Sequence, residues 1–251
     1  MAKRKPQPTA PPPAAPQSKT LREQLAEWTD KVIAAQAGRL PAARIDALRR
    51  QAAALDATAP PVPAKLPVNG TVVVRTSEAL DAVAAALDGA DVVALDLETS
   101  SLDHRNGEVV GVGVATAEGA WYVPVAHRIG ATGLLLPDQP PLTVVADRLG
   151  FHRRRFVAHN GKFEMHWLRQ HGGVVVQIVW DTELAARLMR PDLPADLKRL
   201  AARELDVPDW GLPKAELKRI QYLPVEVVAP YCGKDCAYTL RLMEKQKQCL
   251  S

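Results

Sequence analysis

Residues 92–99, VVALDLET, place two carboxylates inside a stretch that otherwise has the pattern of a buried strand. Alternate side chains of a strand point to the same face. Asp96 and Glu98 therefore project together, while Val93, Leu95 and Leu97 face a core on the opposite side. Two acids this close repel each other unless a cation lies between them. A solvated strand end also accommodates such a pair, so the pair alone does not define a site.

The flanking segments predict an α/β fold. Strands are expected at 71–76, at 92–99, in a hairpin over 108–126 that turns at Glu118–Gly119, and at 154–160. Helices are expected at 77–90, with Ser77 as N-cap and Gly89 near the end, and then at 162–173, 181–189 and 196–205. Three consecutive, mainly antiparallel strands followed by strand–helix alternation indicate a mixed sheet with helices on its faces.

A final helical stretch begins at about residue 224 and contains Pro230. Proline is favoured at the first position of a helix and disruptive inside one. We therefore expect the helix proper to begin at Pro230. Tyr231 and Asp235, four residues apart, then share one helical face.

The N-terminal part of the chain differs in composition from the rest. Residues 1–20 hold six prolines and four cationic residues, which is typical of a disordered basic tail. Residues 21–57 predict two short amphipathic helices, residues 58–70 a linker, and residues 71–251 the main domain. The helical hairpin is interpreted as a packing element of this or a neighbouring chain; an element that grips DNA is the alternative.

The net charge of +4 is unevenly distributed. Residues 1–57 carry ten Lys and Arg against five Asp and Glu, whereas the remainder carries 22 against 23. The main domain therefore has no excess of positive charge that would indicate nucleic-acid binding. The chain contains neither an apolar run of membrane-spanning length nor the apolar segment of a secretory signal.

Three cysteines, Cys232, Cys236 and Cys249, lie in the last twenty residues. This number and placement favour a reducing compartment, hence the cytoplasm, over a disulfide framework. Cys232 and Cys236 are interpreted as small, core-facing thiols, with a zinc site as the alternative.

Further acids accompany the first pair at the ends of other elements. Glu164 lies in the first turn of a helix that leaves a buried strand, and Asn160 comes just before it. Together with Asp96, Glu98 and Asp235, this makes four carboxylates and one tyrosine on three elements. Hard oxygen ligands suit Mg²⁺ or Mn²⁺. Two such ions about 4 Å apart can stabilise the attacking and leaving oxygens of a phosphoryl displacement.

Three motifs in this order, DLETSSLD, NGKFEMHWL and YCGKDCAYTL, resemble the exonuclease motifs of the DEDDy 3′–5′ exonucleases, which have a ribonuclease H-like fold. The chain is most similar to the proofreading domain of bacterial and phage DNA polymerase I. The resemblance spans about residues 71–245 and includes AWYVPVAH, WDT and DLKRLAARELDV.

The resemblance implies a role for each matching residue. Asp96 would bridge two metal ions, Glu98 and Asp235 would each hold one or orient its waters, and Glu164 would act through a water. Tyr231 would orient the attacking water. Five further residues would contact the 3′-terminal nucleotide: Thr99, Leu102, Asn160, Phe163 and Lys162. For Lys162 there are two equal alternatives, a contact with a phosphate and a solvated position at the start of the helix.

The expected reaction is hydrolysis of the 3′-terminal phosphodiester of single-stranded or frayed DNA, which releases nucleoside 5′-monophosphates. The alternatives are a ribonuclease D-like enzyme acting on RNA, and a silent module that binds 3′ ends or docks on a polymerase. The sequence does not determine whether a polymerase domain or partner exists, and the chain is interpreted as free-standing or as part of a split or truncated polymerase.

Two residues depart from the pattern of these relatives. Glu164 stands where most have Asp, so activity is expected but reduced, and Phe163 lacks the hydroxyl of the commoner Tyr. The histidines are interpreted as surface or strand-end residues rather than metal ligands: His104, His127, His159, His166 and His171.

Overall fold

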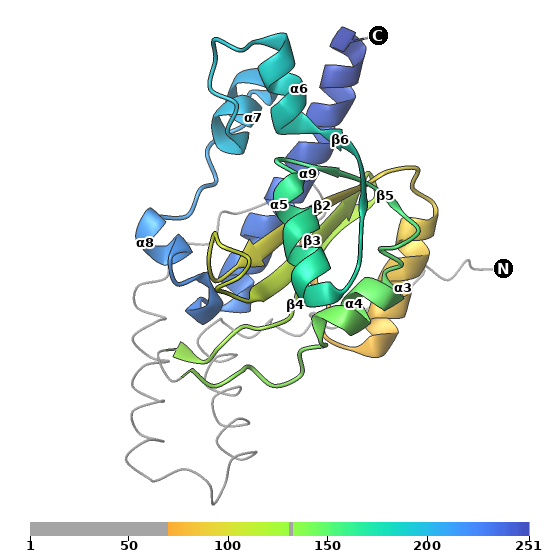
Figure 1. The fold of residues 1–251 in the computed structure, drawn as a ribbon, viewed down its shortest axis with the longest axis vertical. Coiled ribbons are helices and arrows are strands. Elements are labelled where there is room, and N and C mark those ends of the chain that lie inside the picture. Colours follow the sequence, from red (N-terminus) through yellow and green to blue (C-terminus); the bar gives the residue numbers. More distant parts are fainter. Residues whose placement is uncertain (1–69, 131–132, 251) are drawn as a thin grey trace, which may run out of the picture. The chain divides into compact units, whose positions relative to one another are not determined.

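A computed structural model describes residues 70–130 and 133–250 (Figure 1). The elements are β1 (Thr71–Val73), α3 (Ser77–Asp88), β2 (Val93–Thr99), β3 (Val109–Thr116), β4 (Gly119–Pro124), α4 (Leu142–Arg148), β5 (Arg155–Ala158), α5 (Lys162–Trp167), the π-helical turn η2 (Leu168–Gly172), β6 (Gln177–Asp181), α6 (Thr182–Met189), α7 (Leu197–Leu205), α8 (Lys214–Leu217), the 3₁₀ turn η3 (Ile220–Tyr222) and α9 (Val225–Leu250). The predicted tail at 1–20, hairpin at 21–57 and nearly all of the linker at 58–70 lie outside the described residues.

The strands form one six-stranded mixed sheet in the order β1-β4-β3-β2-β5-β6. The pairs β2–β3 and β3–β4 are antiparallel, whereas β1–β4, β2–β5 and β5–β6 are parallel. This confirms the predicted succession of antiparallel and then parallel strands. Strand β2 is therefore central, with the hairpin on one side and the parallel strands on the other.

Helices cover both faces of the sheet, with α9 on one side and α5 on the other in Figure 1. Leu95 and Leu97 of β2 belong to the core cluster that includes the buried side chains of α3, α4 and α5. Ala94, on the other face, packs with Cys236 and Leu240 of α9. The alternation of β2 thus directs its even-numbered side chains, including Asp96 and Glu98, toward the α9 side.

Small residues on β3 allow α9 to approach the sheet closely. A Cβ atom on Gly113 would lie 2.4 Å from the Cys232 sulfur and 2.8 Å from the Cys236 sulfur. Both thiols are buried, which confirms them as core residues. Gly113 pairs with Asp96 across the β2–β3 ladder, so this close approach occurs beside the first acid.

Helix α9 corrects the prediction that the helix begins at Pro230, because it starts at Val225 and contains this proline. The missing N–H of Pro230 removes the hydrogen bond that the Glu226 carbonyl would accept. Val225, Val228 and Ala229 are nevertheless buried against Val110 and Tyr122 of the hairpin. Packing of the first turns therefore maintains a helix that local propensity disfavours.

The N-cap of α3 and the hairpin turn each lie one residue away from the predicted position. Thr76, not Ser77, is the N-cap of α3, and its hydroxyl accepts the Ala79 N–H at 3.2 Å. Thr116 pairs with Gly119, which places the hairpin turn at Ala117–Glu118. Gly89 is the C-cap of α3, as predicted.

His127 connects the hairpin to the segment before α9. Its Nδ1–H donates to the Leu223 carbonyl at 3.2 Å, which leaves Nε2 to accept the Tyr122 hydroxyl at 2.7 Å. Burial lowers the pKa of His127 to about 4, so the ring is neutral at physiological pH. His127 is completely buried three residues after the end of β4, so a surface position is wrong for this histidine, whereas a place near a strand end agrees with the prediction.

No helix among the described residues has the length and apolar character needed to cross a membrane.

Candidate active site

Asp96 and Glu98 lie at the carboxyl end of β2, on the face covered by α9. Glu98 is only 7% exposed, and its Oε1 atom is buried without a hydrogen-bond partner. The β2–β3 register shifts between Glu98 and Thr99, a bulge of the kind that redirects side chains near functional sites. One ligand atom each from Asp96, Glu98 and Cys232 lies within 4.8 Å of the others.

Helix α9 contributes Tyr231 and Asp235 from one face, as predicted. Between them, the Cys232 thiol donates to Asp96 Oδ2 at 3.3 Å. Asp235 is itself buried. Burial is the main cause that raises the pKa values of Asp96 and Glu98, and the negative charge of Asp235 adds to it. The structure therefore brings the third motif next to the first.

Glu164 reaches the same region from α5, on the opposite side of the sheet from α9. It is 3% exposed and its Oε2 atom is buried without a partner. The charges of Asp96 and Glu98 contribute to raising its pKa, which places all four predicted acids in one electrostatic cluster.

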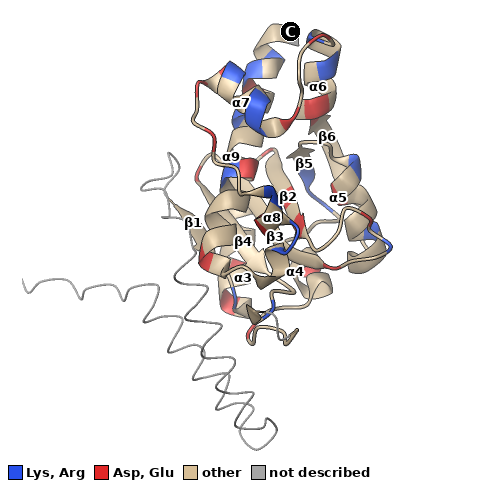
Figure 2. Cartoon of the chain, turned by 90° about the vertical axis from the view of Figure 1, so that its left-hand side faces the viewer, with Lys and Arg blue, Asp and Glu red and all other residues tan. Residues whose placement is uncertain are grey.

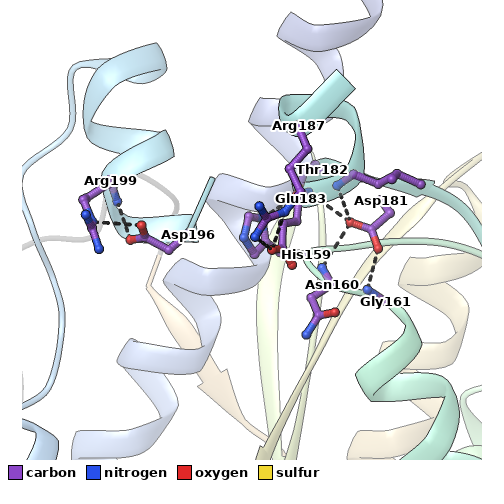
Figure 3. A network of polar contacts seen from close by, with 10 residues as sticks. His159, Asn160, Gly161, Asp181, Thr182, Glu183, Arg187, Asp196 and Arg199 are labelled. Atoms are coloured by element: carbon purple, nitrogen blue, oxygen red, sulfur yellow. Dashed lines mark hydrogen bonds and ion pairs between the residues drawn. The ribbon is translucent and has the colours of Figure 1, made fainter. Parts of the chain in front are cut away.

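Asp181, at the end of β6, holds the turn that precedes α5 (Figure 3). Its Oδ1 accepts the Asn160 N–H at 3.1 Å and its Oδ2 accepts the Gly161 N–H at 2.8 Å. Oδ1 also accepts the first amides of α6, from Glu183 and Leu184. Asn160 has a φ of 67°, a left-handed conformation that is costly for most residues other than glycine. One carboxylate thus caps α6 and fixes the left-handed turn from which Glu164 is presented.

Burial and mutual repulsion determine the electrostatics of the acids. Burial, followed by the charge of Asp235, raises the pKa of Asp96 to about 7. Burial and the charge of Asp96 also raise the pKa values of Glu98 and Glu164 well above the usual range. Burial and mutual repulsion thus disfavour the charged forms of these three carboxylates, which a nearby cation would stabilise.

Lys198 of α7 is a component of the site that the sequence analysis did not identify. Its ammonium donates to both oxygens of Asp235, at 2.6 and 2.5 Å, and to the Tyr231 hydroxyl at 3.1 Å. Trp210 is a second missed residue, whose indole N–H donates to Asp235 Oδ1 at 2.6 Å. The motif DLKRLAAREL contained Lys198, but helical periodicity alone does not indicate what a half-buried cation contacts.

Tyr231 lies beside this ammonium, which is 4.4 Å from the centre of its ring. Burial, followed by the charge of Asp235, raises the pKa of Tyr231. Its hydroxyl therefore stays protonated, which agrees with an orienting role and excludes a role as a general base at neutral pH.

The predicted substrate-contacting residues lie at the end of β2, in the β2–β3 loop, in the turn before α5 and at the start of α5. Leu102 is 89% exposed, and the Thr99 hydroxyl donates to the Ser101 carbonyl at 2.7 Å. Phe163 is half-buried, with its ring 5.9 Å from that of Trp167, and Lys162 is exposed. Their contact with a nucleotide stays a prediction.

The loop that carries Leu102 is anchored on α5 and η2 by aromatic rings. His104 stacks on His166 with ring centres 5.1 Å apart, and the His171 Nε2–H donates to the His104 carbonyl at 2.7 Å. Trp167 lies between these histidines, in contact with the rings of His104 and His171. These histidines support the loop, and their rings contact one another rather than the four acids.

Comparison with known proteins agrees with this geometry. Residues 71–250 match the family model described as a 3′–5′ exonuclease. The chain belongs to the 3′–5′ exonuclease family. Its members are phosphodiester hydrolases, and the match spans every acid of the site as well as Tyr231.

Curated relatives of this exonuclease include DNA polymerase I of Chloroflexus aurantiacus, 32% identical over 181 residues, or 69% of this chain and 19% of the relative. DNA polymerase I of Synechocystis is 32% identical over 166 residues, or 61% of this chain and 16% of the relative. The chain thus spans less than one fifth of the length of these relatives.

Solved structures with the same fold include the catalytic core of RRP6 from Trypanosoma brucei, with a TM-score of 0.55 and 20% identity over 80% of this chain and 55% of that one. Escherichia coli RNase D has a TM-score of 0.52 and 15% identity, covering 70% of this chain and 44% of the other. These similarities confirm the predicted ribonuclease H-like exonuclease fold.

Proposed function

We propose that this exonuclease uses divalent metal ions to remove nucleotides from the 3′ end of single-stranded or frayed DNA, as proofreading domains do. The observation that carries the proposal is the convergence of Asp96, Glu98, Glu164 and Asp235, from β2, α5 and α9, beside Tyr231. The products would be nucleoside 5′-monophosphates.

The chemistry of the donor set fits Mg²⁺ or Mn²⁺. Glu98 Oε1 and Glu164 Oε2 are buried oxygens without partners, which is costly unless a proton or cation compensates them. Carboxylate oxygens are the ligands that these hard cations prefer, and four carboxylates balance the charge of two divalent ions. The group of candidate ligand atoms formed by Asp96, Glu98 and Cys232 contains a single sulfur beside carboxylate oxygens. Zinc sites are built mainly from several Cys and His ligands, so a zinc site is disfavoured.

In this proposal Asp96, Glu98 and Asp235 would hold the divalent cations, and Glu164 would orient a water. Bound cations of this kind stabilise the charge of the reacting phosphate and acidify water. The protein's own contribution is to hold these carboxylates on rigid elements and to orient a water with the Tyr231 hydroxyl. Leu102 and Phe163 provide an exposed apolar side chain and a ring face for an unpaired terminal base.

The preference for DNA is supported by the curated relatives, which are DNA polymerases. The similarity to RRP6 and RNase D is at 15–20% identity, and it supports the fold without a choice of substrate. A polymerase domain or subunit as partner is part of the same proposal, and a pull-down with the full chain as bait would test it.

The decisive experiment compares matched 5′-labelled single strands of DNA and RNA, incubated with the full chain and Mn²⁺ or Mg²⁺. We expect stepwise shortening from the 3′ end of DNA, loss of activity with EDTA, and loss in Asp96→Ala. Asp192→Ala, which removes an exposed acid paired with Arg190, is the matched control and should behave like the parent. Faster cleavage of RNA would identify a ribonuclease D-like enzyme instead.

A second comparison tests the proofreading type. Duplexes with a mismatched 3′ end should be shortened faster than fully paired duplexes, because the site accepts an unpaired terminus. Equal rates would contradict proofreading without contradicting exonuclease activity. Binding of 3′ ends without any cleavage would indicate the silent module.

A further inference from the structure

Lys198 makes the most complete set of contacts in the acidic cluster. Its ammonium bonds both oxygens of Asp235 and the hydroxyl of Tyr231, while 25% of its side chain remains exposed. The Asp235 side chain is only 7% exposed. The predicted metal ligand at the α9 side of the site is thus already neutralised by a cation of the protein itself.

The other acids of the cluster lack such a partner. Glu98 and Glu164 each have a buried oxygen without a hydrogen bond, and Asp96 accepts only a thiol in the contacts described. Both oxygens of Asp235, by contrast, are engaged by Lys198, and Oδ1 also accepts the Trp210 N–H. A metal ion can use Asp235 as a full ligand only if the ammonium moves away.

We propose that Lys198 is a displaceable counter-ion, which occupies Asp235 in the metal-free enzyme and exchanges with a divalent cation when the site is loaded. This inference rests on the proposed metal-dependent function. It assigns to Lys198 the role of a positioning residue that sets metal affinity. In the metal-free enzyme, its charge also reduces the repulsion among the carboxylates.

The surroundings of Lys198 suit such an exchange. Besides Asp235, its ammonium lies 4.4 Å from the ring centre of Tyr231 and 5.2 Å from that of Trp210. Ring faces attract a cation, so the two rings can continue to stabilise the ammonium when it leaves Asp235. Lysine also has a flexible stem and a compact charge, and its partial exposure opens a path toward solvent or a substrate phosphate.

Helix α7 holds Lys198 in place through its N-cap. Asp196 caps this helix by accepting the Arg199 N–H at 3.3 Å, and it pairs with the Arg199 side chain at 2.8 Å (Figure 3). Arg199 follows Lys198 in the helix and carries the same charge. Its side chain is 72% exposed and contacts Asp196 instead of the site. It offers a matched control.

The test is a titration of the full chain with Mn²⁺ alone, with free Mn²⁺ measured by electron paramagnetic resonance. Lys198→Met should bind Mn²⁺ about tenfold more tightly than the parent, which corresponds to about 1.4 kcal/mol. Lys198→Arg, which keeps the charge, and Arg199→Met, which removes a charge outside the site, should each stay within about twofold of the parent. Equal or weaker binding by Lys198→Met would overturn the proposal.

Thermal unfolding distinguishes exchange from a purely structural ion pair. In EDTA, Lys198→Met should have a lower Tm than the parent, because buried Asp235 loses its partner. In saturating Mn²⁺ the two proteins should have the same Tm, since the cation then neutralises Asp235 in both. A deficit of equal size under both conditions would show that Lys198 is a structural residue.

The same titration separates this inference from the proposed function. If the parent takes up no Mn²⁺ and Asp235→Asn behaves identically, the metal-dependent function and the exchange fail together. If the parent binds Mn²⁺ and Asp235→Asn weakens the binding, but Lys198→Met does not strengthen it, only the exchange fails.

Discussion

The thiol of Cys232 donates to the carboxylate of Asp96, so α9 contacts β2 at the acid that the proposed mechanism requires most. This contact depends on Gly113, because a Cβ atom there would overlap the Cys232 and Cys236 sulfurs. The distance between α9 and β2 thus depends on the missing side chain of Gly113 on β3.

Gly113→Ala should therefore destabilise the protein by about 1–3 kcal/mol and lower the cleavage rate, because α9 must move away from β3. Chemical denaturation and the rate on labelled DNA measure the two effects. Gly89→Ala, where a Cβ would meet no atom within 4 Å, is the control. The double variant Gly113→Ala/Cys232→Ala should recover part of the loss, and strict additivity would contradict the overlap.

Asp181→Ala should reduce both stability and activity. Four backbone N–H groups lose their acceptor, and we expect a loss of about 2–4 kcal/mol from the cap and the charged hydrogen bonds. Because two of these amides hold the turn before Glu164, the cleavage rate should fall more than the folded fraction does. Thr76→Ala, which removes the cap of α3 away from the site, should cost about 1 kcal/mol without a change in rate.

In the metal-free enzyme, ionisation of Asp96 at pH 8 should lower the free energy of unfolding. The pKa of Asp96 is raised from 3.8 to about 7, so its protonated form favours folding below pH 4 and this contribution is lost as the pH rises through 7. Asp96→Asn in EDTA should gain about 2–4 kcal/mol over the parent at pH 8 and nothing at pH 4, as measured by urea unfolding. A gain at both pH values would contradict this titration.

His127 should produce the opposite dependence on pH. Its pKa in the folded protein is about 4, against 6.5 for a free histidine, so its contribution is complete above pH 6.5 and is lost as the pH falls toward 4. The loss should approach about 3 kcal/mol. Comparing urea unfolding of the parent and His127→Gln from pH 7 to 4 isolates this term, since the glutamine does not titrate; parallel curves would refute it.

Glu164 tests how far the site tolerates a change of length. Glu164→Gln should lower the cleavage rate by more than about 100-fold, because the carboxylate is lost. Glu164→Asp keeps the charge and shortens the side chain by one methylene. We expect a rate within about tenfold of the parent, since an acid that acts through water tolerates a displacement better than a direct ligand. Collapse of activity in Glu164→Asp would show that this chain is adapted to the longer side chain.

Charge on the surface gives no guidance to the substrate path. Figure 2 shows basic and acidic residues interspersed over α6 and α7. Arg187 pairs with Glu183 and Arg190 with Asp192, so these cations are locally compensated. Under the proposed function, recognition of the nucleic acid would therefore depend on the site itself more than on a basic surface, which agrees with the near-neutral composition of residues 58–251.

Local patterns in the sequence were enough to predict the central strand with its two acids, the hairpin and the helix that carries Tyr231 and Asp235, since alternation and helical spacing report which face a side chain occupies. Strand β6 and helix α4 were not predicted. β6 lies at the edge of the sheet without a clear alternation of burial, and α4 contains β-branched residues whose helical state depends on the burial of Leu142 and Val145.

The sequence alone predicted which acids and which tyrosine belong to one site, because three motifs in a fixed order resemble those of a known family. Only the tertiary structure showed that Lys198 neutralises Asp235, that Asp181 holds the turn before Glu164, and that α9 continues through Pro230. Each of these three features depends on contacts between groups that are far apart in the chain. Such contacts are decided by packing and burial in the folded protein, which the spacing of residues along one helix or strand does not reveal.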